Sequence, residues 1–240
     1  MNNPTFLTIK RYIHYRAVYF LLPTFLAMAL CVSGQKTNRY GLHIVGSMEE
    51  YQQLPLQPGQ RLVLIDSVLK PYFRHVAYQT DTNFTKKVLY IDGHQFFMVK
   101  EAAEKLAAVQ DSLLKLGINL LLFDTYRPYS ITEKMWAAVP DDRYAANPAK
   151  GSMHNRGLAI DLSLADAATG TPLHMPTGYD NFTRKAWPDY KNLPAKAIKN
   201  RNILQNIMKH FGFRSITTEW WHFYWPDRYG CPLLNLRFNQ

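Results

Sequence analysis

Apolar residues recur at helical spacing most clearly between residues 101 and 116. Steps of three and four positions, which align side chains on one helical face, separate Ala102, Leu106, Val109, Leu113 and Leu116. Two acidic residues near the start suit the positive end of a helix dipole, and Gly117 is typical of a helix end. We therefore predict helices over 101–116, over 195–211 and, shorter, over 130–138.

Short apolar or aromatic runs between these segments predict strands. They lie at residues 62–65, 88–91, 118–123, 158–164 and 213–225. No regular pattern occurs in the polar, Gly- and Pro-containing residues 35–60, 70–87 and 165–194, which we interpret as loops. Helices mixed with short strands indicate an α+β fold, with one domain from residue 35 onward.

The first 34 residues have the pattern of a secretory signal peptide. Lys10, Arg11 and Arg16 precede an apolar stretch at 17–30, and small residues follow it. The stretch is shorter than the roughly 20 apolar residues that a membrane span requires, and a proline interrupts it. We expect cleavage of residues 1–34, an exported periplasmic or secreted protein, and no stable membrane insertion.

Two alternatives stay open for this leader. If it is retained, the N-terminal segment anchors the protein in the membrane. Cys31, directly after the apolar stretch, would instead suit a lipoprotein signal, although the bulky Leu30 precedes it.

Composition narrows the class of protein. Hydrophobic residues make up 47% of the 240 residues, which excludes a disordered or collagen-like chain. Of the two cysteines, only Cys231 would remain after cleavage, so no internal disulfide is expected. Losing three cations of the leader takes the formal net charge from +10 to +7, which is compatible with an anionic surface such as a bacterial envelope. No basic run is interleaved with aromatics, and we expect no nucleic-acid partner.

Two of the eight histidines stand near carboxylates at spacings that suit a hydrolytic metal site. Such a site needs three N or O ligands, an open position for water, a carboxylate base and a group that stabilises an oxyanion. His154, Asp161 and His222 can provide the ligands. Glu219 can then act as the base, and Arg127, after a predicted buried strand, as the oxyanion donor.

These spacings also arise by chance. In the alternative interpretation, Asp161 caps a turn and His222 packs within an aromatic strand, and no metal is bound. Spacing alone leaves both interpretations open.

Longer blocks carry a resemblance to a known family. The pattern Ser-x-His-x6-Asp, followed by Glu-x-Trp-His, resembles the zinc D-alanyl-D-alanine dipeptidases of the vancomycin-resistance type, in the group that includes lysostaphin, the D-Ala-D-Ala carboxypeptidases and the hedgehog signalling domain. Residues 78–85 are similar to the family's Tyr-Ala-Thr-x-Asn-Phe-Thr, 124–128 to Asp-x-Tyr-Arg-Pro, and 175–182 to Met-Gly-Thr-x-Phe-Asp. The resemblance covers about residues 60–230.

The resemblance implies a zinc D,D-dipeptidase domain at 35–240, with a central, mostly antiparallel sheet and flanking helices. It implies one Zn²⁺ per chain, bound by His154, Asp161 and His222. Glu219 would be the general base and acid, and Arg127 would stabilise the tetrahedral intermediate.

The resemblance also implies how a small peptide substrate is held. Ser152, Asp180 and Tyr78 would bind the free ammonium of the dipeptide, a charge that a buried carboxylate anchors well. The chain departs from the family blocks at Gln79, Lys86 and Pro176, all near the expected substrate pocket, so these departures concern substrate preference.

The implied activity is hydrolysis of D-alanyl-D-alanine to two D-alanines in cell-wall peptide turnover. One alternative is a D,D- or L,D-carboxypeptidase or endopeptidase that acts on longer peptidoglycan stem peptides. Asp180 argues against it, because such substrates present no ammonium near the scissile bond. A non-catalytic, zinc-containing binding module is a further alternative, against which the full set of catalytic residue types argues.

Overall fold

The computed structural model describes residues 37–90 and 93–238. The predicted signal segment 1–34 lies outside this part, so its cleavage and the domain boundary after it stay predictions. Within the described residues, no helix is long and apolar enough to cross a bilayer.

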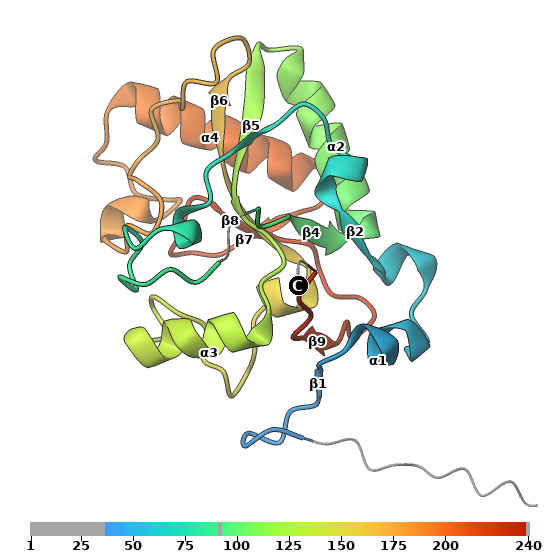
Figure 1. Ribbon diagram of the computed structural model, residues 1–240. Helices are drawn as coiled ribbons and strands as arrows, with labels where there is room; N and C mark the ends of the chain where they lie inside the picture. The colour runs from blue at the N-terminus through green and yellow to red at the C-terminus, as the bar shows by residue number, and fades with distance from the viewer. Residues whose placement is uncertain (1–36, 91–92, 239–240) are drawn as a thin grey trace, which may run out of the picture. The chain divides into compact units, whose positions relative to one another are not determined.

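A five-stranded sheet forms the centre of the fold, in the order β3-β5-β6-β8-β7 (Figure 1). Its strands are β3 (Phe73–Arg74), β5 (Ile118–Asp124), β6 (Ala159–Asp166), β7 (Arg214–Ser215) and β8 (His222–Tyr224). β3 runs parallel to β5, and every other pair in this sheet is antiparallel. The predicted α+β fold with a mostly antiparallel sheet is confirmed.

Three helices of ten residues or more flank or adjoin this sheet: α2 (Lys100–Leu114), α3 (Tyr129–Ala138) and α4 (Ala195–His210). Their positions confirm the three predicted helices to within two residues at each end. α2 packs on β5, and α4 crosses behind the β5–β6 pair to contact β6 (Figure 1). The apolar face that the residue spacing predicts for α2 is buried in the main core.

The two faces of the β5–β6 pair differ in character. Leu120 pairs with Leu164 and Leu122 with Leu162, so these four leucines share one face and join the core with the helices. The register then shifts between Leu122 and Asp124, which places Asp124 opposite Asp161. In regular pairing Asp124 would share the face of Leu122, so this irregularity turns its carboxylate to the other side of the sheet.

Shorter elements complete the described fold. Two two-stranded sheets pair β1 (Ile44–Val45) with β9 (Leu233–Leu234) and β2 (Leu62–Leu64) with β4 (Phe97–Val99). The short helices are α1 (Met48–Gln53), η1 (Pro58–Gln60), η2 (Ile65–Ser67), η3 (Ala77–Gln79), η4 (His154–Arg156) and η5 (Arg184–Ala186). Most of these short helices lie in the predicted loops, because helices of three to six residues are too short to show a period in the sequence.

Two predicted strands are wrong. Residues 213–225 form two short strands, β7 and β8, that pair antiparallel as the chain turns back between them. Residues 88–90 are not in a strand, because the amides of Leu89 and Tyr90 both donate to the carbonyl of Tyr78 instead of to a neighbouring strand. Ile91, the last residue of that prediction, lies outside the described part.

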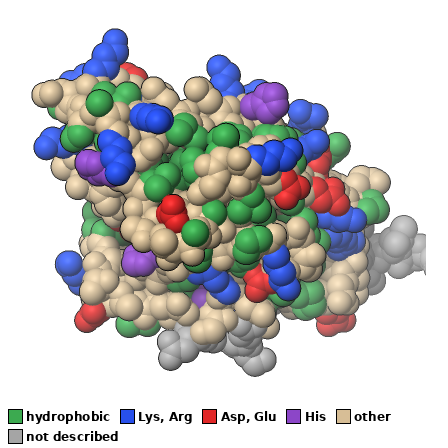
Figure 2. Space-filling model, turned by 90° about the horizontal axis from the view of Figure 1, so that it is seen from above, with side chains coloured by type: hydrophobic (Ala, Val, Ile, Leu, Met, Phe, Trp, Pro, Cys, Tyr) green, Lys and Arg blue, Asp and Glu red, His purple; other side chains and the backbone are tan. Residues whose placement is uncertain are grey.

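Charged side chains are dispersed on the face of the molecule shown in Figure 2. Lys and Arg side chains are scattered over this face, separated by polar and hydrophobic groups, and do not merge into one basic patch. The net positive charge is therefore spread out on this side of the protein.

Candidate active site

Asp161 and His222 lie directly opposite each other on β6 and β8. Opposed residues of an antiparallel pair project from the same face, so the two side chains meet. Oδ1 of Asp161 is 2.9 Å from Nδ1 of His222. The sheet register thus joins the two sequence motifs that each contain one of these residues.

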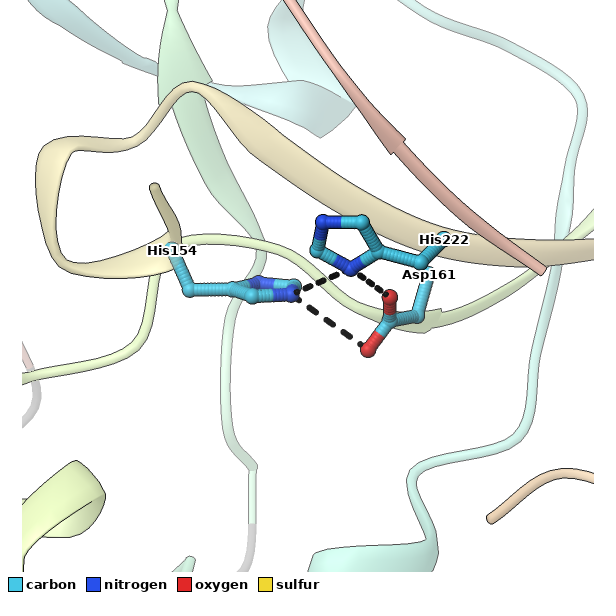
Figure 3. A group of neighbouring side chains, drawn as sticks. All are labelled: His154, Asp161 and His222. Atoms are coloured by element: carbon cyan, nitrogen blue, oxygen red, sulfur yellow. Dashed lines mark hydrogen bonds and ion pairs between the residues drawn. The ribbon is translucent and has the colours of Figure 1, made fainter. Parts of the chain in front are cut away.

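His154 enters the cluster from the short helix η4, in the loop before β6 (Figure 3). Its Nδ1 lies 2.6 Å from the carbonyl oxygen of Thr125, to which it donates a hydrogen bond. This bond leaves Nε2 with its lone pair free, 3.4 Å from Oδ2 of Asp161 and 3.3 Å from Nδ1 of His222. The imidazole is therefore anchored on one side and presents a ligand atom on the other.

Gly157 allows the tight return of the chain between His154 and Asp161. Its φ of +66° lies in the left-handed region. A Cβ at this position would meet Cδ2 of Leu62 at 2.2 Å, so Leu62 would have to move to admit a side chain.

The geometry of the three side chains fits a tetrahedral metal ion. Bonds of about 2.0–2.2 Å to a central ion place neighbouring ligand atoms roughly 3.3–3.6 Å apart. Nε2 of His154 has this separation from Nδ1 of His222, 3.3 Å, and from Oδ2 of Asp161, 3.4 Å, while His222 contacts the other oxygen of Asp161, Oδ1, at 2.9 Å. Two imidazoles and one carboxylate form a donor set suited to zinc, with a fourth position left for water.

The charge on Asp161 suits a ligand. Burial alone would raise the pKa of this carboxyl, but the imidazoles of His154 and His222 reverse that effect and hold the pKa well below its usual range. The carboxylate is therefore anionic at neutral pH, as metal binding requires.

Glu219 stands beside the cluster without belonging to it. Its Oε2 is 4.0 Å from Nδ1 of His222. Burial, and to a smaller extent the charge of Asp161, raise the pKa of Glu219 to about 7, against the opposing effects of His222 and Arg127. A carboxylate with a pKa near neutrality can accept a proton and return it.

Arg127 is held in a fixed orientation by Asp124. Its Nε and Nη2 are 2.8 and 2.7 Å from Oδ2 of Asp124, and Asp124 also accepts hydrogen bonds from the hydroxyl of Tyr90 and the amide of Thr125. The same Nη2 is 3.8 Å from Oδ2 of Asp161. A buried, fully ionised guanidinium therefore faces the metal cluster.

Asp180 and Tyr78 form a second polar group in this pocket. The hydroxyl of Tyr78 donates to Oδ1 of Asp180 over 3.2 Å, and Oδ2 of Asp180 is buried without a hydrogen-bond partner. Burial and the nearby charge of Asp161 raise the pKa of Asp180 well above its ordinary value. The site thus holds a buried carboxyl group with one oxygen, Oδ2, that no side chain hydrogen-bonds.

Ser152 contributes to the same pocket and also fixes the η4 loop. Its hydroxyl oxygen accepts a hydrogen bond from the amide of His154 over 3.2 Å. All eight residues singled out in the sequence line this one pocket: Tyr78, Arg127, Ser152, His154, Asp161, Asp180, Glu219 and His222.

Sequence reasoning missed Tyr179. Its hydroxyl donates to Oδ2 of Asp161 over 2.8 Å. The available signal was its position beside Asp180 in the Met-Pro-Thr-Gly-Tyr-Asp segment, at a place where the family block has phenylalanine. Asp124 was quoted within its motif but not recognised as the partner that orients Arg127.

Comparison with known proteins adds independent information. A family model described as D-ala-D-ala dipeptidase matches residues 59–239. A D-alanyl-D-alanine dipeptidase of Escherichia coli is 35% identical over 164 residues, which cover 68% of this chain and 84% of the relative. One from Enterococcus faecalis is 31% identical over 193 residues, covering 70% and 95%.

Among solved structures, an LD-carboxypeptidase aligns with a TM-score of 0.39 and 19% identity, over 71% of this chain and 70% of the other. A likeness at this level carries no argument about activity.

Proposed function

The chain belongs to the D-Ala-D-Ala dipeptidase family and is a peptidase, and from that premise we propose that it hydrolyses D-alanyl-D-alanine to two D-alanines with one bound Zn²⁺. The observation that carries the proposal is the pocket in which the trio of His154, Asp161 and His222 adjoins the carboxylate of Glu219 and a buried Asp180 with one oxygen that has no hydrogen-bond partner.

The catalytic steps follow from the positions of these side chains. His154, Asp161 and His222 would hold the zinc ion, which would supply a more acidic water and polarise the peptide carbonyl. Glu219 takes the proton of the attacking water and delivers it to the leaving amine, which its pKa of about 7 suits. Arg127, kept in place by Asp124, offers its guanidinium to the negative charge that develops on the carbonyl oxygen.

The free ammonium of a dipeptide matches the environment of Asp180. A buried carboxylate without a cation is unfavourable, and an ammonium group supplies both the charge and a hydrogen bond to Oδ2. Tyr78 and Ser152 lie in the same pocket and serve as further polar partners. An acylated peptide presents no such charge, so this feature favours a dipeptide over a longer stem peptide.

The activity is tested with three substrates. Purified zinc-loaded protein is incubated with D-Ala-D-Ala, L-Ala-L-Ala and N-acetyl-D-Ala-D-Ala, and released alanine is measured. We expect release from the unblocked D,D-dipeptide alone, and its loss when a chelator is added. Release from the acetylated compound instead would identify a carboxypeptidase, and release from none of the three would overturn the proposal.

We also propose that the protein acts outside the cytoplasm, on dipeptide from cell-wall turnover. The support is the signal-like pattern of residues 1–34. Fractionation of expressing cells and N-terminal sequencing of the mature protein test this. A full-length chain in the cytoplasmic fraction would contradict export, and a full-length chain in the membrane fraction would indicate a retained anchor.

A further inference from the structure

Four side chains form a continuous line from the metal cluster to the carboxylate at the far side of the pocket. The hydroxyl of Tyr179 is 2.8 Å from Oδ2 of Asp161 and 3.1 Å from the hydroxyl of Tyr78. Tyr78 is in turn 3.2 Å from Oδ1 of Asp180. Two tyrosines thus connect the expected metal ligand with the expected ammonium anchor.

The ring of Tyr179 is held by other aromatic side chains. Its centroid is 4.5 Å from that of Phe123, 5.6 Å from Trp221 and 6.0 Å from Tyr78. These are contacts between rings, so aromatic packing fixes the position of the Tyr179 ring, and its hydroxyl is available for hydrogen bonds.

Each tyrosine hydroxyl has a single proton, which decides which group donates along these four side chains. A carboxylate that ligates a metal is ionised and can only accept, so Tyr179 is the donor to Oδ2 of Asp161. The hydroxyl of Tyr179 is also the donor to the oxygen of Tyr78, and the one proton of Tyr78 goes to Oδ1 of Asp180.

We propose that Tyr179 is a positioning residue that orients Asp161 for the metal and, through Tyr78, connects this ligand to the site of the substrate's ammonium. A hydrogen bond to a ligating carboxylate fixes its rotation and tunes its basicity. Tyr78 is a second acceptor for the single proton of Tyr179, so a change at Tyr78 alters the bond to Asp161. The part that concerns Asp161 needs only the metal, and the part that concerns the ammonium rests on the proposed dipeptidase function.

Zinc affinity in the absence of substrate tests the proposal. The dissociation constant is measured by competition with a chromophoric chelator for the wild type, Tyr179→Phe, Tyr78→Phe and the double variant. Phenylalanine keeps the ring contacts and removes only the hydroxyl. Tyr72→Phe is the matched control, because it removes a tyrosine hydroxyl that donates to a carboxylate, that of Asp66, outside the pocket.

We expect Tyr179→Phe to raise the zinc dissociation constant by about tenfold or more. Tyr78→Phe removes the competing acceptor and should lower the dissociation constant by about threefold, and the double variant should match Tyr179→Phe alone, because Tyr78 acts through Tyr179. The visible absorption of the Co²⁺ form, which reports ligand geometry, should change in Tyr179→Phe and stay unchanged in Tyr72→Phe.

An affinity of Tyr179→Phe within twofold of both wild type and Tyr72→Phe would overturn the positioning role. A double variant that binds zinc about threefold more tightly than Tyr179→Phe would show independent effects and would overturn the link through Tyr78. Circular dichroism of the metal-free proteins shows whether each variant is folded, and Tyr78→Phe still tests the link if Tyr179→Phe is not. Because no substrate is present, these outcomes are separate from success or failure of the dipeptidase assay.

Discussion

Asp161 on β6 and His222 on β8 are direct cross-strand partners, and their side chains meet with 2.9 Å between Oδ1 and Nδ1. A slip of one residue in this register would send the two side chains to opposite faces of the sheet. The candidate metal centre therefore depends on the pairing of β6 with β8 as much as on the identity of its ligands.

Replacing Asp161 with asparagine should remove metal binding. The amide keeps the size of the side chain but loses the charge that two imidazoles stabilise in the folded protein. We expect the zinc dissociation constant to rise by about 100-fold or more, and added zinc to stop raising the melting temperature. Metal content after dialysis and thermal melts with and without zinc measure this. Asp66→Asn, outside the pocket, is the control and should retain one zinc per chain.

Glu219→Gln should separate metal binding from catalysis. The side chain lies beside His222 but outside the ligand trio, so zinc content should stay at the wild-type level. Loss of the proton acceptor should lower kcat for D-Ala-D-Ala by about 10²–10⁴-fold. Metal analysis and steady-state kinetics on one preparation test both statements. A zinc-loaded variant with wild-type kcat would assign the base to another residue.

Arg127→Lys should impair the chemical step more than substrate binding. A guanidinium can bond Asp124 through Nε and Nη2 and still face the pocket, whereas an ammonium group cannot reproduce this fork. We expect kcat to fall by about 100-fold with KM within about threefold of wild type. The opposite split, with KM raised and kcat kept, would show that Arg127 binds the substrate and does not stabilise the oxyanion.

Asp180→Asn should weaken binding of substrates that carry a free ammonium. The variant removes the buried negative charge that the ammonium would pair with. We expect KM for D-Ala-D-Ala to rise by about tenfold or more, while inhibition by an acetylated dipeptide changes little. If both compounds lost affinity equally, Asp180 would be shaping the pocket and not binding the charge.

Gly157→Ala should destabilise the fold. A positive φ costs a non-glycine residue about 1–2 kcal/mol, and the new methyl group would collide with Leu62 at 2.2 Å. We expect a loss of about 3 kcal/mol in unfolding free energy, measured by urea denaturation. Gly117→Ala is the control, because Gly117 has φ +68° but nothing within 4 Å of its Cβ position, and it should lose only about 1 kcal/mol. Equal losses of unfolding free energy in the two variants would show that Leu62 moves away from the new methyl group at no measurable cost in stability.

The hydrophobic pattern of the sequence correctly predicted the long elements, which have either one apolar face or a continuous apolar run. α2 and α4 follow from their apolar periodicity, and β5 follows from an apolar run that is buried almost throughout. The β7–β8 hairpin was predicted as one strand, because aromatic residues continue through the turn and mask it. The side of the sheet on which the Asp124 side chain lies was not predicted either. It depends on a register shift between β5 and β6, which the sequence of β5 alone does not reveal.

The sequence by itself predicted the ligand set, the base and the residues around the expected ammonium, because short blocks with fixed spacing resemble those of the family, and it determined the long elements of the fold. The tertiary structure decided which atoms face one another: the carbonyl of Thr125 behind His154, Asp124 behind Arg127, and Tyr179 on Asp161. These partners come from separate elements, and their approach depends on strand register and on the packing of whole side chains. Spacing along a chain records neither, since a hydrogen bond forms only where folding brings donor and acceptor within about 3 Å.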